Sequence, residues 1–164
     1  LLVTTLNSKG AINCAPFAWA TPLSMDPPIL LFAPWYESHT FANIKENKEF
    51  VVNMTPYKYK KEVEICAKEY PEGENELEHA KLAWHSSNKV KPPRVDGCLG
   101  YLECRARNIL KEKEYSAVIA DVLNIDMPGY DEDIKPRDEV LMHIGGNDYF
   151  GFKGIEKKEK KKER

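Results

Sequence analysis

The sequence predicts a mainly β protein built around an antiparallel barrel. Six or seven short segments have strand-type patterns, and the helical patterns are confined to two insertions between them. Turn-type sequences join several of the neighbouring strand segments, which favours antiparallel pairing over a parallel sheet with crossover helices. A chain of 164 residues with no internal repeat and no interdomain linker suits one domain.

The first half of the chain supplies four of these strands and one helix. The turn sequence NSKG (Asn7–Gly10) joins the first two strands as a hairpin, and the DPP break at residues 26–28 precedes the third. Ser38 or Thr40 is expected to cap a helix, because a hydroxyl there can accept a hydrogen bond from a first-turn N–H. The predicted strands are residues 1–5, 11–19, 29–33 and 50–54.

The second half begins with two helical patterns, at residues 58–68 and at residues 75–84, the latter capped by Asn75. Paired prolines exclude regular helix from Asn88–Val95. Leu102, Cys104 and Ala106 alternate with charged residues, which is typical of a strand with one wet face. The predicted strands of this half are residues 100–109 and 115–125, and a short segment at residues 140–144 leads into a hairpin turn and a closing strand.

Charge is unevenly distributed along the chain. The formal net charge is −2, but the segment Glu156–Arg164 holds six basic and three acidic residues, which leaves about −5 on residues 1–155. This balance argues against a nucleic-acid partner for the folded part. We therefore expect a folded domain at residues 1–152 and a solvated, charged tail at residues 153–164.

The sequence predicts a cytoplasmic protein. No apolar run approaches the roughly 20 residues of a membrane helix, and the start LLVTTLNSKG has no basic leader typical of a secretory signal. Because the chain begins abruptly with apolar residues, we expect that a few residues have been trimmed from its start. Cys14, Cys66, Cys98 and Cys104 have no CxxC spacing, which predicts reduced, packed thiols.

No side-chain catalytic device or metal site is predicted. The four histidines lack an HExxH pattern, and no GxSxG elbow, GxGxxG or Walker-type loop is present. The paired carboxylates occur in surface-like runs such as Asp131–Asp133. We therefore expect any reaction to take place on a cofactor, with no residue acting as a catalytic acid or base.

Several residues suit a phosphorylated, planar cofactor, although each has a simpler interpretation. Ser38 and Thr40 precede a helix whose N-terminus attracts phosphate, or they merely cap it. Thr21 and Ser24 offer hydroxyl donors, or they are turn residues. The basic residues of the rigid loop NKVKPPR, namely Lys89, Lys91 and Arg94, either neutralise a phosphate or are simply solvated.

A set of short motifs in fixed order covers nearly the whole chain. The order is LVTT…GxxNxAPF…PLSxDPP…SHTxxNI…EFVVN…ENELExAxLAW…KVKPPR…LEC…HIGGxxYF, from Leu1 to about Phe150. It resembles the flavin reductase-like and flavoredoxin family with a split barrel that binds flavin mononucleotide (FMN). The resemblance implies a six-stranded antiparallel Greek-key barrel with short helical insertions, which dimerises with FMN near the subunit interface.

The resemblance also implies where FMN binds. Residues Asn13, Cys14 and Ala15 would contact the isoalloxazine edge, and the segment Thr21, Pro22, Leu23 and Ser24 would line the ribityl phosphate. The phosphate would be held by Ser38, His39, Thr40 and Asn43, with Lys89 and Lys91 as basic partners, and His143 would approach the ring.

The reaction implied by the resemblance is hydride transfer from NADH or NADPH to FMN, followed by electron transfer to an acceptor or redox partner protein. Relatives carry a histidine in a GDHxL-type segment associated with nicotinamide binding, whereas this chain has Tyr115 or Ser116 there. Cys14 is either a small packed residue or a redox thiol. The alternative functions are an FMN-binding electron carrier or storage protein without catalytic activity, and a binding barrel without flavin.

Overall fold

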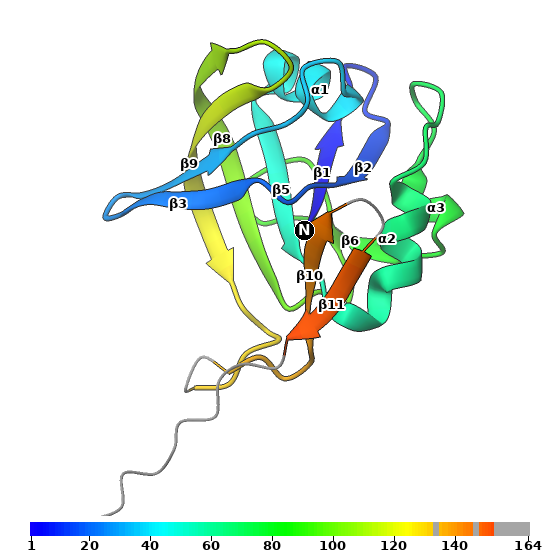
Figure 1. Cartoon of the computed structure of the whole chain (residues 1–164). Helices are drawn as coiled ribbons and strands as arrows, with labels where there is room; N and C mark the ends of the chain where they lie inside the picture. The colour runs from blue at the N-terminus through cyan, green and yellow to red at the C-terminus, as the bar shows by residue number, and fades with distance from the viewer. Residues whose placement is uncertain (133–134, 146–147, 153–164) are drawn as a thin grey trace, which may run out of the picture.

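In a computed structural model, which describes residues 1–132, 135–145 and 148–152, seven antiparallel strands form one strongly curved sheet (Figure 1). Its strand order is β2-β1-β5-β8-β9-β4-β3. The strands are β1 (Leu2–Leu6), β2 (Ile12–Pro16), β3 (Ala20–Met25), β4 (Pro28–Phe32), β5 (Glu49–Met54), β8 (Gly100–Lys111) and β9 (Ser116–Asp126). The predicted mainly β antiparallel class is confirmed.

The two edge strands of the sheet, β2 and β3, are consecutive in the sequence. The short connection Phe17–Trp19 therefore joins one edge of the sheet to the other. This link is backbone-bonded on both sides: Phe17 N–H donates to Leu1 C=O at 2.9 Å, and Ala33 N–H donates to Trp19 C=O at 2.9 Å. The barrel is thus split at this connection, with its interior side chains close to the opening.

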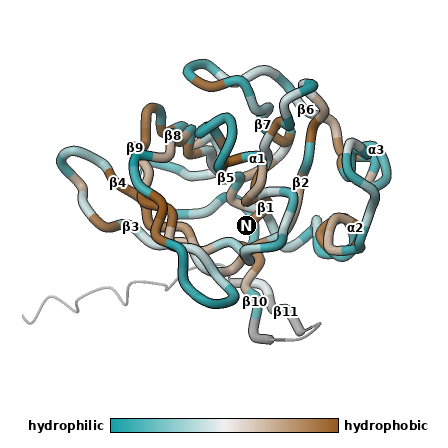
Figure 2. Tube along the Cα trace, turned by 90° about the horizontal axis from the view of Figure 1, so that it is seen from above, coloured by the Kyte–Doolittle hydropathy of each residue, from teal (hydrophilic) through white to brown (hydrophobic). Residues whose placement is uncertain are grey.

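The sheet separates two apolar cores because successive strand residues point to opposite faces. Val3 and Val52 belong to one core with Phe32 and Phe50, whereas their neighbours Leu2 and Val51 belong to the other. Central strands buried on both faces carry few charged residues, which fits the run LVTTL of β1, where the buried Thr4 hydroxyl donates to Pro93 C=O at 2.6 Å. Figure 2 shows hydrophobic colouring on barrel strands such as β4 and β9, and hydrophilic colouring on connecting loops.

Helix α1 (His39–Asn47) packs on the first of these cores through Phe41 and Ile44. Its N-cap is Ser38, whose hydroxyl accepts the Phe41 N–H, and Lys48 ends it with a φ of 65°. The opposite core is covered by the 3₁₀ turn η1 (Tyr57–Tyr59), α2 (Lys60–Cys66) and α3 (Glu76–His79) (Figure 1). None of the described helices is long and apolar enough to cross a membrane.

Two small hairpin-like sheets complete the described part. Strands β6 (Trp84–His85) and β7 (Arg94–Val95) pair with each other, as do β10 (Val140–Gly145) and β11 (Asp148–Phe152). The second pair is anchored beside η1, since Leu141 N–H donates to Thr55 C=O at 3.1 Å and Tyr57 N–H donates to Glu139 C=O at 2.6 Å. This anchoring places β10 at the same opening as the Phe17–Trp19 connection.

The structure differs from the sequence prediction at three elements. The strand expected at residues 11–19 ends at Pro16, which has no N–H to extend the ladder. Residues 20–25 form the seventh strand, β3, where the sequence indicated only a proline-constrained segment. The helix expected at residues 75–84 stops at His79, because the chain turns at Lys81 with a φ of 55°. The predicted tail, residues 153–164, lies outside the described residues.

Candidate functional site

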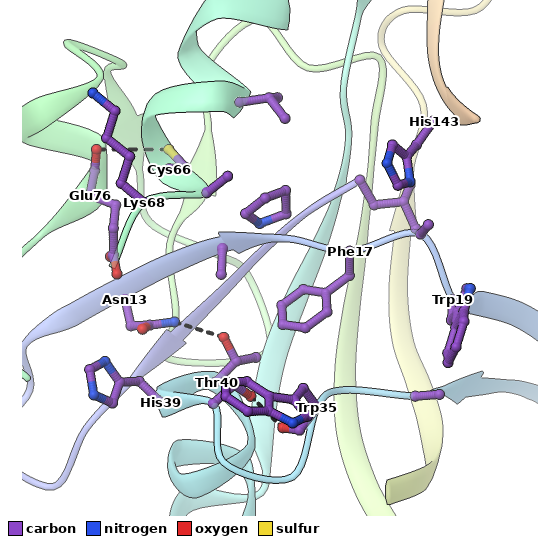
Figure 3. Close-up of a pocket in the computed structure, with 18 of the residues that line it drawn as sticks. Asn13, Phe17, Trp19, Trp35, His39, Thr40, Cys66, Lys68, Glu76 and His143 are labelled. Carbon is purple, nitrogen blue, oxygen red and sulfur yellow. Dashed lines mark hydrogen bonds between the residues drawn. The ribbon is translucent and has the colours of Figure 1, made fainter. Parts of the chain in front are cut away.

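A large pocket of about 870 Å³ opens at the split of the barrel. Small-molecule sites span about 300–1,000 Å³, so this volume suits a ligand of cofactor size. Its walls come from segments far apart in the sequence: β2 and the Phe17–Trp19 connection, the start of α1, the end of α2, the first residue of α3, and the β10–β11 pair. Figure 3 shows side chains from these elements facing the pocket.

Hydroxyl groups and helix amides form one wall of the pocket. Ser38 Oγ accepts the Phe41 N–H at 3.1 Å and donates to Trp35 C=O at 2.7 Å, which fixes the start of α1. Thr40 is fully buried, and its Oγ1 accepts a hydrogen bond from Asn13 Nδ2 at 2.9 Å (Figure 3). The first-turn N–H groups of His39 and Thr40 have no intrahelical acceptor, so this wall favours an anionic group.

Aromatic residues form a second wall. Phe17, Trp19, Trp35 and Tyr115 line the pocket, and the Trp19 and Tyr115 rings lie 4.6 Å apart between centroids. Trp19 and Trp35 are 58% and 45% exposed, so a large part of each ring is open to a ligand. Flat aromatic surfaces of this kind suit stacking against a planar ring system.

A third part of the wall carries charged groups. Lys68 and Glu76 lie on the same side of the pocket as Asn13 and His39, whereas Trp19 and His143 lie on the opposite side of Phe17 (Figure 3). Glu76 is 6% exposed, and its Oε2 accepts the Cys14 N–H at 2.8 Å. Burial raises the pKa of the Glu76 carboxyl, more than the hydrogen bonds from the backbone N–H groups of Cys14 and Glu76 lower it.

The four thiols are buried and free. Burial raises the pKa of Cys14 well above its usual value, and the neighbouring Cys66 thiol adds to the shift. Burial also raises the pKa of Cys98 to about 12. Thiols in such surroundings are poorly ionised and behave as small apolar side chains.

Six of the residues predicted from the sequence come together around this pocket. Asn13 and Ala15 alternate along β2, Ser38, His39 and Thr40 start α1, and His143 extends from β10. They are separated by up to 130 positions in the sequence, and the split of the barrel brings them to one opening.

The other predicted residues lie elsewhere in this chain. Cys14 points into the core between the sheet and α2, and Asn43 is buried beneath the pocket, where its Nδ2 donates to Thr5 Oγ1 at 3.0 Å. Lys89 and Lys91 lie in the loop before β7, whose backbone N–H groups bind Glu103 and Glu49. The remaining four residues, Thr21, Pro22, Leu23 and Ser24, form β3 and do not line the pocket.

The sequence prediction named Tyr115 but missed the other aromatic residues of the wall, and it also missed the charged residues Lys68 and Glu76. One signal for the wall was present, because Phe17 continues the period-two alternation of Asn13 and Ala15 and so faces the same side. Lys68 and Glu76 gave no comparable signal, since they lie in charged segments typical of a solvated surface. Among the described residues, no group of three or more His, Cys, Asp or Glu side chains is placed to hold a metal ion.

The comparison with known families decides the relationship. Residues 1–149 match the model of the "Flavin reductase like domain". The chain belongs to the flavin reductase-like family. A relative from Methanothermobacter thermautotrophicus, itself uncharacterised, is 29% identical over 129 residues, covering 76% of this chain and 61% of the relative. The reductase subunit HsaB of a flavin-dependent monooxygenase from Mycobacterium tuberculosis is 25% identical, with 92% of this chain and 74% of HsaB covered.

The fold of this flavin reductase-like protein is also found among solved structures. Flavoredoxin of Desulfovibrio vulgaris (Miyazaki F) superposes with a TM-score of 0.84 at 16% identity, covering 98% of this chain and 90% of flavoredoxin. The expected split-barrel architecture is thus confirmed, with seven strands in the main sheet where six were expected. The chain spans about three fifths of the length of the Methanothermobacter relative.

Proposed function

We propose that this protein is an FMN-dependent oxidoreductase of the flavin reductase type, with FMN held in the 870 Å³ pocket. The observation that carries the proposal is the combination of an anion-favouring helix start and an aromatic wall within one pocket of a flavin reductase-like domain. A phosphorylated planar molecule needs both features, and the donor set of the described residues fits such a molecule.

The residues have distinct tasks in this proposal. The first-turn N–H groups of α1, held in place by the Ser38 cap, bind the phosphate, while the alternating residues Asn13 and Ala15 of β2 position the ring system. When bound, FMN supplies reversible two-electron chemistry, with NADH or NADPH as the proposed reductant. The aromatic wall formed by Trp19 and Tyr115 offers a stacking surface and excludes water from one side of the pocket.

We further propose that the reduced protein passes electrons to a separate acceptor, a proposal supported by its similarity to HsaB, the reductase subunit of a flavin-dependent monooxygenase. We also propose a homodimer, supported by exposed apolar side chains on β3 and β9, namely Leu23, Met25, Leu123 and Ile125. Four free, buried cysteines suit a reducing compartment, which supports the cytoplasmic location. Light scattering during size-exclusion chromatography tests the dimer, and a monomeric mass would contradict it.

Anaerobic titration tests the proposed reaction. The protein is loaded with FMN, mixed with NADH or NADPH under argon, and followed through the flavin absorption band. We expect the band to bleach with at least one of the two nucleotides. Tight FMN binding without bleaching would instead favour the electron carrier or storage protein, and failure to bind FMN would overturn both flavin functions.

A further inference from the structure

A buried carboxyl group in the pocket wall has no task in the function proposed above. Glu76 is the first residue of α3, it is 6% exposed, and it lines the pocket. Carboxylates are almost never buried to this degree unless they are paired with a cation. Among the described residues, none of the ion pairs involves Glu76. This carboxyl therefore stands out among the acidic side chains around the pocket.

One carboxyl oxygen of Glu76 accepts a hydrogen bond from the edge strand β2. Backbone N–H groups along an edge strand point alternately toward its neighbour and away from it. The Phe17 N–H points toward β1 and donates to Leu1 C=O, so the Cys14 N–H points away from β1, toward the open edge of the sheet. Glu76 Oε2 accepts this N–H at 2.8 Å. The bond fixes the carboxyl beside Asn13 and Ala15, which alternate along β2 and line the pocket. The other oxygen, Oε1, makes no hydrogen bond with another described side chain.

The surroundings of the carboxyl favour its neutral form. Burial raises its pKa, against the opposing influence of nearby backbone N–H groups and of two histidines. A neutral carboxyl is both a donor and an acceptor, whereas a carboxylate only accepts. The titratable and charged groups around it come from β2, α1, the end of α2 and α3, and they are Cys14, His39, Cys66, Lys68 and His79.

We propose that Glu76 is a ligand-binding residue that donates a hydrogen bond as an un-ionised carboxyl to a carbonyl oxygen of the bound flavin ring. Its Oε2 continues to accept the Cys14 N–H, and its Oε1 carries the proton that is directed into the pocket. The inference rests on the proposed flavin function, because the isoalloxazine ring presents two carbonyl oxygens that need donors. Ionisation of Glu76 would replace this donor by a negative charge and weaken binding.

The test compares flavin affinity of the wild type, Glu76→Gln and Glu76→Leu between about pH 5 and about pH 8.5, a range that lies above the pKa of an ordinary carboxyl. A glutamine amide accepts the Cys14 N–H and donates permanently, so it mimics the neutral acid. Riboflavin is titrated in parallel with FMN, since it has the same ring but no phosphate that ionises near pH ~6. Fluorescence quenching of each flavin gives the dissociation constants.

For the wild type we expect the riboflavin dissociation constant to rise with pH, by at most about tenfold per pH unit for one proton. Glu76→Gln should bind riboflavin at least as tightly as the wild type at low pH, and its dissociation constant should not rise with pH. Glu76→Leu should bind about tenfold more weakly at low pH, which corresponds to one hydrogen bond of about 1.4 kcal/mol. Glu78→Gln, a change at an exposed acid of the same helix outside the pocket, should leave the wild-type profile unchanged.

Two results would overturn the assignment: a Glu76→Gln profile that rises like the wild type, or Glu76→Leu affinity equal to the wild type. Glu76→Leu removes the hydrogen bond to the Cys14 N–H, so circular dichroism is recorded for each variant to check that it is folded. If the Glu76→Leu variant is unfolded, the pH profile of Glu76→Gln alone tests the proposal. Failure of the wild type to bind either flavin at any pH is a different outcome, because it would overturn the proposed function together with this inference.

Discussion

Arg94 and Glu103 form a buried ion pair, in which Arg94 Nε donates to Glu103 Oε1 at 2.8 Å and the side chains are 5% and 0% exposed. Glu103 also accepts the backbone N–H groups of Asn88 and Lys89, at 2.9 and 2.6 Å. Arg94 makes a second ion pair with Asp126 at 2.7 Å. The Glu103 carboxylate on β8 therefore holds one end of the proline-containing loop against the sheet, and Glu49 on β5 also binds the loop by accepting the Lys91 N–H.

Glu103→Ala should destabilise the fold by about 3–5 kcal/mol, because it leaves the buried Arg94 guanidinium without its main partner. Urea denaturation followed by tryptophan fluorescence measures the loss. Glu112→Ala, at an exposed position between β8 and β9, is the matched control and should change stability by less than about 0.5 kcal/mol. Equal effects of the two substitutions would show that the ion pair does not stabilise the loop.

Ser38→Asp should weaken FMN binding by about tenfold or more while leaving the helix intact. Aspartate caps helices as well as serine does, so the α1 start is retained. Its negative charge would repel a phosphate bound at the same N–H groups. Riboflavin lacks the phosphate, and its affinity should be unchanged in isothermal titration calorimetry. An equal loss for both flavins would contradict the phosphate position.

Tyr115→Leu should weaken nicotinamide nucleotide binding by about 1–3 kcal/mol, the usual contribution of an aromatic ring stacked on a base. Tyr115 is 39% exposed beside Trp19, so one face of the ring pair is accessible. The concentration dependence of anaerobic flavin bleaching by NADH measures this effect, with Tyr115→Phe as the control that keeps the ring. If Leu behaves like Phe, the nicotinamide does not stack there.

Glu76→Gln should raise the stability of the ligand-free protein at neutral pH. Burial raises the pKa of this carboxyl in the folded state above its unfolded value. The folded state then binds more protons than the unfolded state between these two values, so wild-type stability falls as pH rises through that interval. The gain from Gln should shrink toward about pH 4, below the unfolded carboxyl pKa.

Thermal unfolding at a series of pH values measures this difference between Glu76→Gln and the wild type. The control is Glu78→Gln, because Glu78 is exposed on the same helix and its substitution should give no pH-dependent gain. A gain from Glu76→Gln that persists unchanged at low pH would mean that the substitution acts through packing and not through ionisation.

The sequence by itself determined the antiparallel β class and the two long strands β8 and β9, and it limited the α1 cap to Ser38 or Thr40, of which the structure shows Ser38. These features depend on local signals, namely period-two alternation, turn residues and a hydroxyl before a helix. Residues such as Asn13, Ser38 and Thr40 were also predictable as pocket residues, since the ordered motifs of the family carry them.

Only the tertiary structure decided which polar residues share the pocket. Lys89 and Lys91 are basic and lie in a rigid loop, which suits a phosphate partner, but their backbone N–H groups bind Glu103 and Glu49 on another part of the sheet. Glu76 resembles a surface acid in the sequence, and its burial follows from the contact of α3 with the open edge of β2. Burial and proximity arise from strands far apart in the chain, so no local pattern could reveal them.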